Sequence, residues 1–316
     1  MEDRLIMLDK KKIQSKFLGE GFYDFGSVLN KKKCFELKKL INKNRPCSKN
    51  IFYKSKKEFL KKGKFKNYSP GTADHNAIYN LNLDLDFIEK SPNFIRAVES
   101  IVGKNYSIKK KSIIRSVPKS IHPLWASKIT KDIGRPNVNP YIKRKYQDVQ
   151  YFQNIDFHQD MTRGKKFITF YIYLDDVKEK DSPLKILSGS YKFGASHYPH
   201  YIRPGSKRNE WFYSDLAGDH MMCKQIDVYG KAGKIFCFHG LNLHGTALNF
   251  NKTPRVSLRY LIQSDNKHVL KSCLGKSFKL VKGKIVENRK LKNGMNFQRL
   301  DRASDGRFLK TGTSIL

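Results

Sequence analysis

Apolar positions follow a helical period in the first third of the chain. Between residues 29 and 41, and again between residues 83 and 102, they recur three or four positions apart among charged residues, as in amphipathic helices. Ser91-Pro92 predicts a break in the second stretch and Gly103 predicts its end, because proline starts helices and glycine follows their last turn. The repeating positions are Leu29, Cys34, Leu37, Leu40 and Ile41, then Leu83, Phe87, Ile88, Phe94, Ile95, Val98, Ile101 and Val102.

Residues 118–145 follow neither a helical nor a strand period. The segment is rich in Pro, Lys, Asn and Gly, which predicts a long irregular connection. Loops of this length without secondary structure are uncommon in compact domains unless they have a function. We therefore expect this loop to act as a lid over a pocket.

From about Val149 the apolar positions form short runs typical of strands. Residues 167–174 are apolar or aromatic apart from Thr169, and residues 234–239 and 256–262 form similar runs. Turns containing Gly, Asn and Pro separate them. Strands at this spacing indicate a β-sandwich or barrel, so the expected fold class is mainly β with flanking helices.

Neither an internal repeat nor a domain boundary is visible, so we expect a single domain over residues 1–316. Within it, residues 1–148 form a mixed, mostly helical support, and residues 149–262 form the β core. Residues 263–316 form a basic C-terminal extension. From Lys276 onward this extension has few large apolar residues, which predicts a surface strand pair or a loose tail.

The composition is that of a soluble globular protein. Hydrophobic residues make up 39% of the chain, the mean hydropathy is −0.61, and no stretch approaches the roughly 20 apolar residues of a membrane span. Residues 1–7 include acids and lack a continuous apolar region, which is unlike a secretory signal. Five cysteines without close CxxC spacing argue against a disulfide scaffold or a structural zinc site. These features predict a cytoplasmic protein.

A formal net charge of +35 allows two interpretations. A field of this sign attracts nucleic acid, anionic membrane surfaces or phosphorylated substrates. Alternatively, the excess is compositional, because it consists mostly of lysine and occurs together with many Asn and Ile residues. The lysine runs contain no signature of an RNA- or DNA-binding module, so we favour a solvated surface over a functional basic face.

The pair His158-x-Asp160 carries the most chemical information. Side chains two apart on a strand point to the same face, so an imidazole and a carboxylate lie together. A second histidine from another strand completes a set of two imidazoles and one carboxylate, with His244 as the first candidate and His239 as its rival. This set suits a non-haem Fe(II) and leaves positions for a co-substrate and dioxygen.

Several motifs around this pair follow one another in a fixed order. They are Gly19-Glu20-Gly21-Phe22, residues 157–160, 171–177, 182–191, 232–240 and 244–249, and Pro254-Arg255. Together they resemble the phytanoyl-CoA dioxygenase family of Fe(II)/2-oxoglutarate oxygenases. The resemblance covers residues 19–262 and is strongest between residues 157 and 262.

The resemblance implies a double-stranded β-helix, also called a jelly roll or cupin-like core. It implies that His158, Asp160 and His244 are the ligands of Fe(II), and that 2-oxoglutarate and O2 are co-substrates. It also implies a dioxygenase that hydroxylates its substrate and releases succinate and CO2. Asp160 retains the carboxylate that related halogenases replace with a small residue, so oxygen transfer is the expected outcome.

Further residues correspond to co-substrate positions of the family. Arg255, eleven residues after His244, matches the arginine that binds the distal carboxylate of 2-oxoglutarate, a task for which a guanidinium fork is suited. Arg259 shares the Arg255 face of the same strand and is the alternative for this role. Thr246 and Ser257 are hydroxyls expected to bind the same co-substrate, Ser257 on strand geometry alone. Tyr171 lines the co-substrate or is a core aromatic.

Three functions remain open from the sequence. The first is an oxygenase acting on a small molecule or lipid-like substrate, for which the positive charge favours an anionic one. The second is the same chemistry on nucleic acid, with the lysine-rich face following phosphates. The third is a jelly-roll binding protein without turnover.

Overall fold

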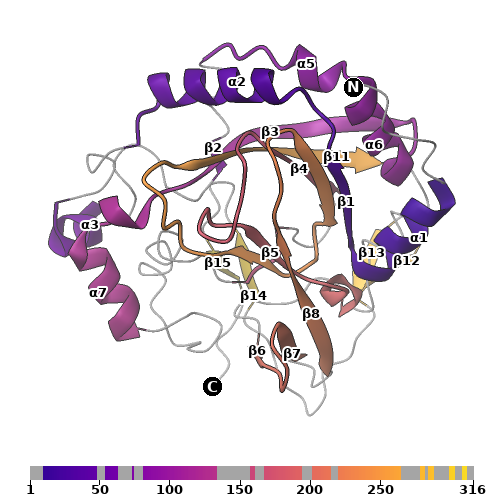
Figure 1. Cartoon of the computed structure of the whole chain (residues 1–316). Helices are drawn as coiled ribbons and strands as arrows, with labels where there is room; N and C mark the ends of the chain where they lie inside the picture. The colour runs from indigo at the N-terminus through magenta and orange to yellow at the C-terminus, as the bar shows by residue number, and fades with distance from the viewer. Residues whose placement is uncertain are drawn as a thin grey trace.

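Two antiparallel sheets form the centre of the computed structural model (Figure 1). The first contains β1 (Phe22–Ser27), β2 (Ala73–Asp74), β3 (Tyr106–Ser116), β4 (Ile168–Tyr173), β9 (Lys234–His239) and β11 (Arg255–Ser264). The second contains β5 (Leu184–Leu187), β6 (Tyr201–Pro204), β7 (Glu210–Ser214), β8 (His220–Val228) and β10 (His244–Thr246). The structure describes residues 10–47, 54–62, 73–74, 81–133, 157–160, 167–193, 201–214, 220–264, 278–281, 284–287, 299–302 and 308–311.

Connections that cross between the two sheets define the fold. The first sheet has the order β1-β9-β4-β11-β3-β2, and the second has the order β10-β5-β8-β7-β6. Along the chain, β4 is followed by β5 in the other sheet, β8 by β9, β9 by β10, and β10 by β11. This alternation is the topology of a double-stranded β-helix and confirms the predicted mainly β, cupin-like fold.

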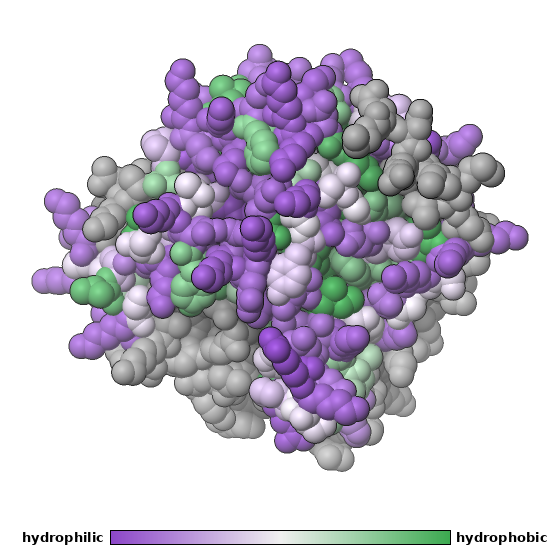
Figure 2. Space-filling view, viewed as in Figure 1, coloured by the Kyte–Doolittle hydropathy of each residue, from purple (hydrophilic) through white to green (hydrophobic). Residues whose placement is uncertain are grey.

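Helices cover the outer face of the first sheet. They are α1 (Lys10–Glu20), α2 (Lys31–Asn44), α5 (Asp86–Glu89) and α6 (Pro92–Val102). The exposed side of α2, at the top of the view, is hydrophilic (Figure 2). α6 begins with Pro92 and ends before Gly103, as predicted, since proline lacks the amide hydrogen that a helix interior needs.

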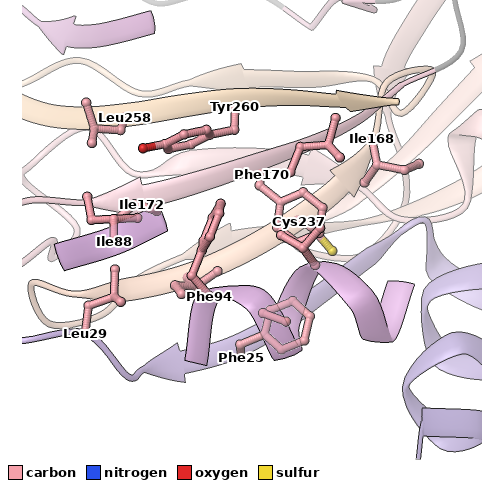
Figure 3. Close-up of a cluster of buried hydrophobic side chains, with 14 of the residues drawn as sticks. Phe25, Leu29, Ile88, Phe94, Ile168, Phe170, Ile172, Cys237, Leu258 and Tyr260 are labelled. Atoms are coloured by element: carbon pink, nitrogen blue, oxygen red, sulfur yellow. The ribbon is translucent and has the colours of Figure 1, made fainter. Parts of the chain in front are cut away.

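A large apolar cluster joins these helices to the sheet (Figure 3). Phe94 of α6 lies 5.2 Å from Tyr260 of β11 and 6.5 Å from Phe170 of β4, measured between ring centroids. Burying a side chain of this size stabilises the fold by roughly 2–3 kcal/mol. Val256 and Leu258 belong to the same cluster, so alternate residues of β11 point outward to the helices. The intervening residues therefore point between the two sheets.

Most predicted elements agree with the structure. The helix predicted after residue 29 is α2, the strands predicted at 167–174, 234–239 and 256–262 are β4, β9 and β11, and the C-terminal segment contains strand pairs. These pairs are β12 (Phe278–Val281) with β13 (Lys284–Glu287), and β14 (Arg299–Arg302) with β15 (Phe308–Thr311).

Two parts of the chain differ from the prediction. The predicted irregular segment 118–145 contains α7 (Leu124–Ile133), because ten residues between Pro123 and Gly134 contain neither Gly nor Pro. Its remaining residues from Gly134 lie outside the described part, so the lid stays a prediction. The sheets also take β2 and β3 from the segment before residue 149, which was expected to be mixed and mostly helical. The short α3 (Lys56–Lys62) lies in this segment too.

Among the residues that the structure describes, no helix has the length and apolar character that crossing a membrane requires.

Candidate metal centre

Backbone hydrogen bonds bring His158 and His244 together. The amide of each donates to the carbonyl of the other, both at 3.0 Å, which forms an antiparallel bridge at the start of β10. Directly opposed residues in such a bridge place their side chains on the same face. The two imidazole rings accordingly lie 4.4 Å apart between centroids. The histidine pair is thus positioned by the main chain.

Asp160 completes a group of three ligand-type side chains. Its amide donates to the carbonyl of Gly240 at 3.1 Å, which ties it to the turn before β10. One carboxylate oxygen lies 3.8 Å from Nε2 of His158, and the other lies 3.5 Å from Nε2 of His244. The three ligand atoms lie within 4.8 Å of one another, and no other such group of three occurs among the described residues.

The backbone around Asn242 orients the imidazole of His244. Nδ1 of His244 lies 3.0 Å from the carbonyl oxygen of Asn242, which leaves Nε2 directed toward Asp160. The buried Asn242 amide donates to the carbonyl of Gly21 at 2.8 Å and accepts from the Tyr191 amide at 3.0 Å. The sequence does not indicate this role, because the partners of Asn242 are far away along the chain.

His239, the rival ligand, lies on the face of β9 that points toward the helices, away from the space between the sheets. Its ring stacks on Tyr191 at 4.5 Å and lies 6.4 Å from Phe17 of α1. Its Nδ1 accepts a hydrogen bond from the Leu241 amide at 3.1 Å. Burial lowers the pKa of His239 to about 3, so the ring is neutral at ordinary pH. The described residues offer it no group of metal-binding partners.

Asp160 also faces a buried cation. Nη1 of Arg259 lies 2.9 Å from one oxygen of the Asp160 carboxylate. Burial alone would raise the pKa of Asp160, but the positive charge of Arg259, with smaller contributions from His244 and His158, holds this pKa well below its usual value. Asp160 is therefore an anion at neutral pH, as a metal ligand must be.

Arg255 lies four residues before Arg259 and therefore on the same face of β11. Its side chain is buried, with 3% of the residue exposed. Its Nη1 donates to the hydroxyl of Ser257 at 3.3 Å, and its guanidinium lies 5.7 Å from the centre of the Tyr173 ring. Its Nε is buried and, within the described part of the chain, has no hydrogen-bond partner. A buried guanidinium with an unused donor suits a carboxylate ligand, since leaving such a donor unpaired is costly.

The other two predicted co-substrate residues also lie between the sheets. Tyr171 faces Arg259 across β4 and β11 and lies 5.6 Å from the rings of Phe236 and Phe238. Burial raises the pKa of Tyr171 to about 12, so its hydroxyl keeps its proton. Thr246 is buried two residues after His244 on β10, and therefore on the same face.

The three ligand-type side chains fit a divalent first-row metal. Two neutral imidazoles and one carboxylate form the facial set typical of non-haem Fe(II), which leaves coordination positions open.

Comparisons with known proteins find distant structural similarity. No family model matches the chain, and no curated protein matches its sequence. SnoN, an α-ketoglutarate-dependent non-haem epimerase from nogalamycin biosynthesis, is 13% identical with a TM-score of 0.49, covering 81% of this chain and 83% of SnoN. The non-haem monooxygenase ThoJ is 12% identical with a TM-score of 0.47, and the match covers 80% of this chain and 78% of ThoJ.

A third similar structure is SnoK, an α-ketoglutarate-dependent non-haem carbocyclase from nogalamycin biosynthesis. It is 12% identical with a TM-score of 0.44, covering 88% of this chain and 94% of SnoK. SnoN has also been solved in complex with Fe3+, α-ketoglutarate and nogalamycin RO. At these identities and TM-scores, the fold of this chain rests on its own strand order.

Proposed function

We propose that this protein is an Fe(II)- and 2-oxoglutarate-dependent dioxygenase that hydroxylates a small-molecule substrate. The observation that carries the proposal is the convergence of His158, Asp160 and His244 within 4.8 Å, inside a double-stranded β-helix. Two imidazoles and one carboxylate are the ligand set that non-haem Fe(II) enzymes use. The ordered motifs between residues 157 and 262 support membership of the phytanoyl-CoA dioxygenase family.

Iron and 2-oxoglutarate, when bound, supply the oxidation of a C–H bond by O2 with release of succinate and CO2. The residues of the chain bind and orient these partners. His158, Asp160 and His244 would hold the metal. Arg255 binds the distal carboxylate of 2-oxoglutarate through its unpaired Nε and its Nη groups.

Aromatic side chains around the site exclude water from it. Tyr171, Tyr173, Phe236 and Phe238 form one buried cluster between the two sheets. Such an apolar wall strengthens the charge-assisted hydrogen bond between Arg255 and a carboxylate, because water does not compete for it. Ser257 holds the Arg255 guanidinium from the side, and Thr246 offers a further hydroxyl near the metal.

The test is an anaerobic titration of the metal-free protein with Fe(II) and 2-oxoglutarate, followed by visible spectroscopy. We expect the charge-transfer band of the Fe(II)–2-oxoglutarate chelate in the wild type and its loss in His158→Ala. Arg255→Met should weaken 2-oxoglutarate binding by about 10- to 100-fold, as expected for the loss of a buried charged hydrogen bond.

Arg96→Met provides the matched control for this experiment. Arg96 is an exposed arginine of α6, on the outer helix layer, so its loss should leave the band and the affinity for 2-oxoglutarate unchanged. A folded wild-type protein that forms no band under these conditions would refute the proposed function. An affinity for 2-oxoglutarate that survives in Arg255→Met would refute the role of Arg255.

A further inference from the structure

Arg259 is a second guanidinium beside the candidate metal centre. Its side chain is 13% exposed, and its Nη1 lies 2.9 Å from the Asp160 carboxylate. Its Nε is buried and has no hydrogen-bond partner among the described residues. Because Arg255 and Arg259 lie on the same face of one strand, the space between the sheets contains two positive charges.

The ion pair between Arg259 and Asp160 leaves Arg259 incompletely neutralised once a metal binds. Nη1 of Arg259 and Nε2 of His244 approach the same oxygen of Asp160, at 2.9 Å and 3.5 Å. A divalent cation bound to that carboxylate neutralises most of its negative charge. A metal bound there therefore weakens this ion pair, the only one that Arg259 makes among the described residues.

Counted over the residues that the structure describes, the charges around the site do not balance without a further anion. A divalent metal, Arg255 and Arg259 are opposed by the Asp160 carboxylate and the two carboxylates of 2-oxoglutarate, which leaves one positive charge unmatched. The other charged side chains next to the described barrel interior are already paired, Asp175 with Lys38 and Asp24 with Lys234. An unmatched buried charge is costly, so an anionic ligand that neutralises it is favoured.

We propose that Arg259 binds an anionic group of the substrate, such as a carboxylate, phosphate or sulfonate, next to the metal centre. This inference rests on the proposed function and adds the substrate class to it. Tyr171, directly opposite Arg259 on β4, is placed to donate its hydroxyl to the same group. In this arrangement Arg255 binds the co-substrate, and Arg259 orients the substrate.

The 2-oxoglutarate carboxylates share this anionic chemistry, so the experiment must distinguish the two sources. The Fe(II)–2-oxoglutarate complex is formed anaerobically and titrated with methanesulfonate, a small anion that is a poor metal ligand. Dimethyl sulfone, which has nearly the same shape and no charge, is titrated in parallel. The readouts are the position and intensity of the charge-transfer band and the affinity for 2-oxoglutarate.

The wild type and Arg96→Met should show a saturable change of the band with methanesulfonate and none with dimethyl sulfone. Arg259→Met should weaken the methanesulfonate response by about tenfold or more, while changing the affinity for 2-oxoglutarate by no more than about twofold. Arg259→Lys, which keeps the charge but loses the fork, should restore part of the response. Circular dichroism and thermal melting check that each variant is folded.

Three results would overturn the inference. Equal responses in the wild type and Arg259→Met, or no response in the wild type, would exclude an anion site at Arg259. A loss of 2-oxoglutarate affinity in Arg259→Met as large as in Arg255→Met would assign Arg259 to the co-substrate instead. If the wild type forms no charge-transfer band at all, the proposed function itself fails, which is a different and recognisable outcome.

Discussion

The main chain, rather than side-chain packing, holds His158 and His244 in place. The backbone amide of each residue donates a hydrogen bond to the carbonyl of the other, and the Asp160 amide donates to the carbonyl of Gly240. Removal of an imidazole therefore leaves these backbone hydrogen bonds intact. Substitutions of His158 and His244 should therefore report on metal binding without unfolding the barrel.

His239 should make the stability of the protein depend on pH. Its pKa is about 3 in the folded state and about 6.5 when unfolded, so the unfolded chain binds an extra proton between these values. The stabilisation from burying the neutral His239 ring is fully present above pH ~6.5 and is lost progressively as the pH falls below that value. Below pH ~6 we expect the free energy of unfolding to fall by up to about 1.4 kcal/mol per pH unit from this residue. Denaturant unfolding at several pH values measures it.

His239→Asn is the comparison variant, because the asparagine side chain keeps an acceptor for the Leu241 amide. It should be less stable than the wild type near pH 7 and should have a shallower decline between pH ~6.5 and ~5. His122, whose pKa burial lowers to about 4, contributes a decline in the same direction to both proteins. Parallel pH profiles for the two proteins would contradict the assignment.

The residues of the candidate site were predictable to different degrees. The spacing of His158 and Asp160 is visible along the chain, and the resemblance to a known oxygenase family implied the roles of His244 and Arg255. From the sequence, His239 remained an alternative to His244 as a ligand. In the structure, the alternation of β9 directs the His239 side chain outward, away from the candidate site. The ion pair of Arg259 with Asp160 joins residues 99 positions apart, so it depends on strand register that no local pattern reveals.

At the scale of elements, the turn before β9 connects the barrel to the helix layer. The Gly233 carbonyl accepts hydrogen bonds from the amides of Val28 and Leu29, both at 3.1 Å, and its amide donates to Tyr173 at 2.8 Å. Gly233 has a φ of +84°, and a Cβ there would lie 2.4 Å from the Leu29 carbonyl oxygen. Only glycine fits this position without strain.

Gly233→Ala should destabilise the protein by at least about 2 kcal/mol, through backbone strain and the clash with Leu29. Gly19→Ala is the matched control, since a Cβ at Gly19 meets no atom within 4 Å and the residue lies in α1. The control should be neutral or stabilising by up to about 1 kcal/mol. Chemical denaturation compares the two, and equal stabilities would show that the turn tolerates a side chain.

β3 and α7 show why some elements were not predicted. The first half of β3 is partly exposed and includes Lys109-Lys110-Lys111, whereas its last five residues are all buried between neighbouring strands. Alternation is limited to the first four residues, so no sustained strand period is visible. α7 is a short helix within a segment rich in Pro, Lys, Asn and Gly, and averaging the composition over that segment hides it.

At the scale of the whole molecule, charge is the dominant feature. Lys and Arg number 63 against 28 Asp and Glu, and hydrophilic side chains cover much of the visible face (Figure 2). A net charge of +35 repels itself in the compact state. Exposed ion pairs such as Lys90–Asp86, with side chains 76% and 63% exposed, offset little of this repulsion.

Salt should therefore stabilise the folded protein. Raising NaCl from ~0.01 M to ~0.15 M shortens the Debye length from about 30 Å to about 8 Å and screens the repulsion. We expect the melting temperature to rise by several degrees over this range, measured by differential scanning fluorimetry. An uncharged osmolyte at the same osmolality is the control. A melting temperature that stays constant or falls with salt would show that the lysines are already compensated.

The most direct test of the candidate metal centre is a Co(II) titration followed by visible absorption, with two histidine variants compared. The wild type and His239→Asn should each bind one equivalent of Co(II), and His244→Ala should lose this binding while remaining folded. Metal binding that survives in His244→Ala but disappears in His239→Asn would contradict the site. A folded wild type that binds no Co(II) would contradict it as well.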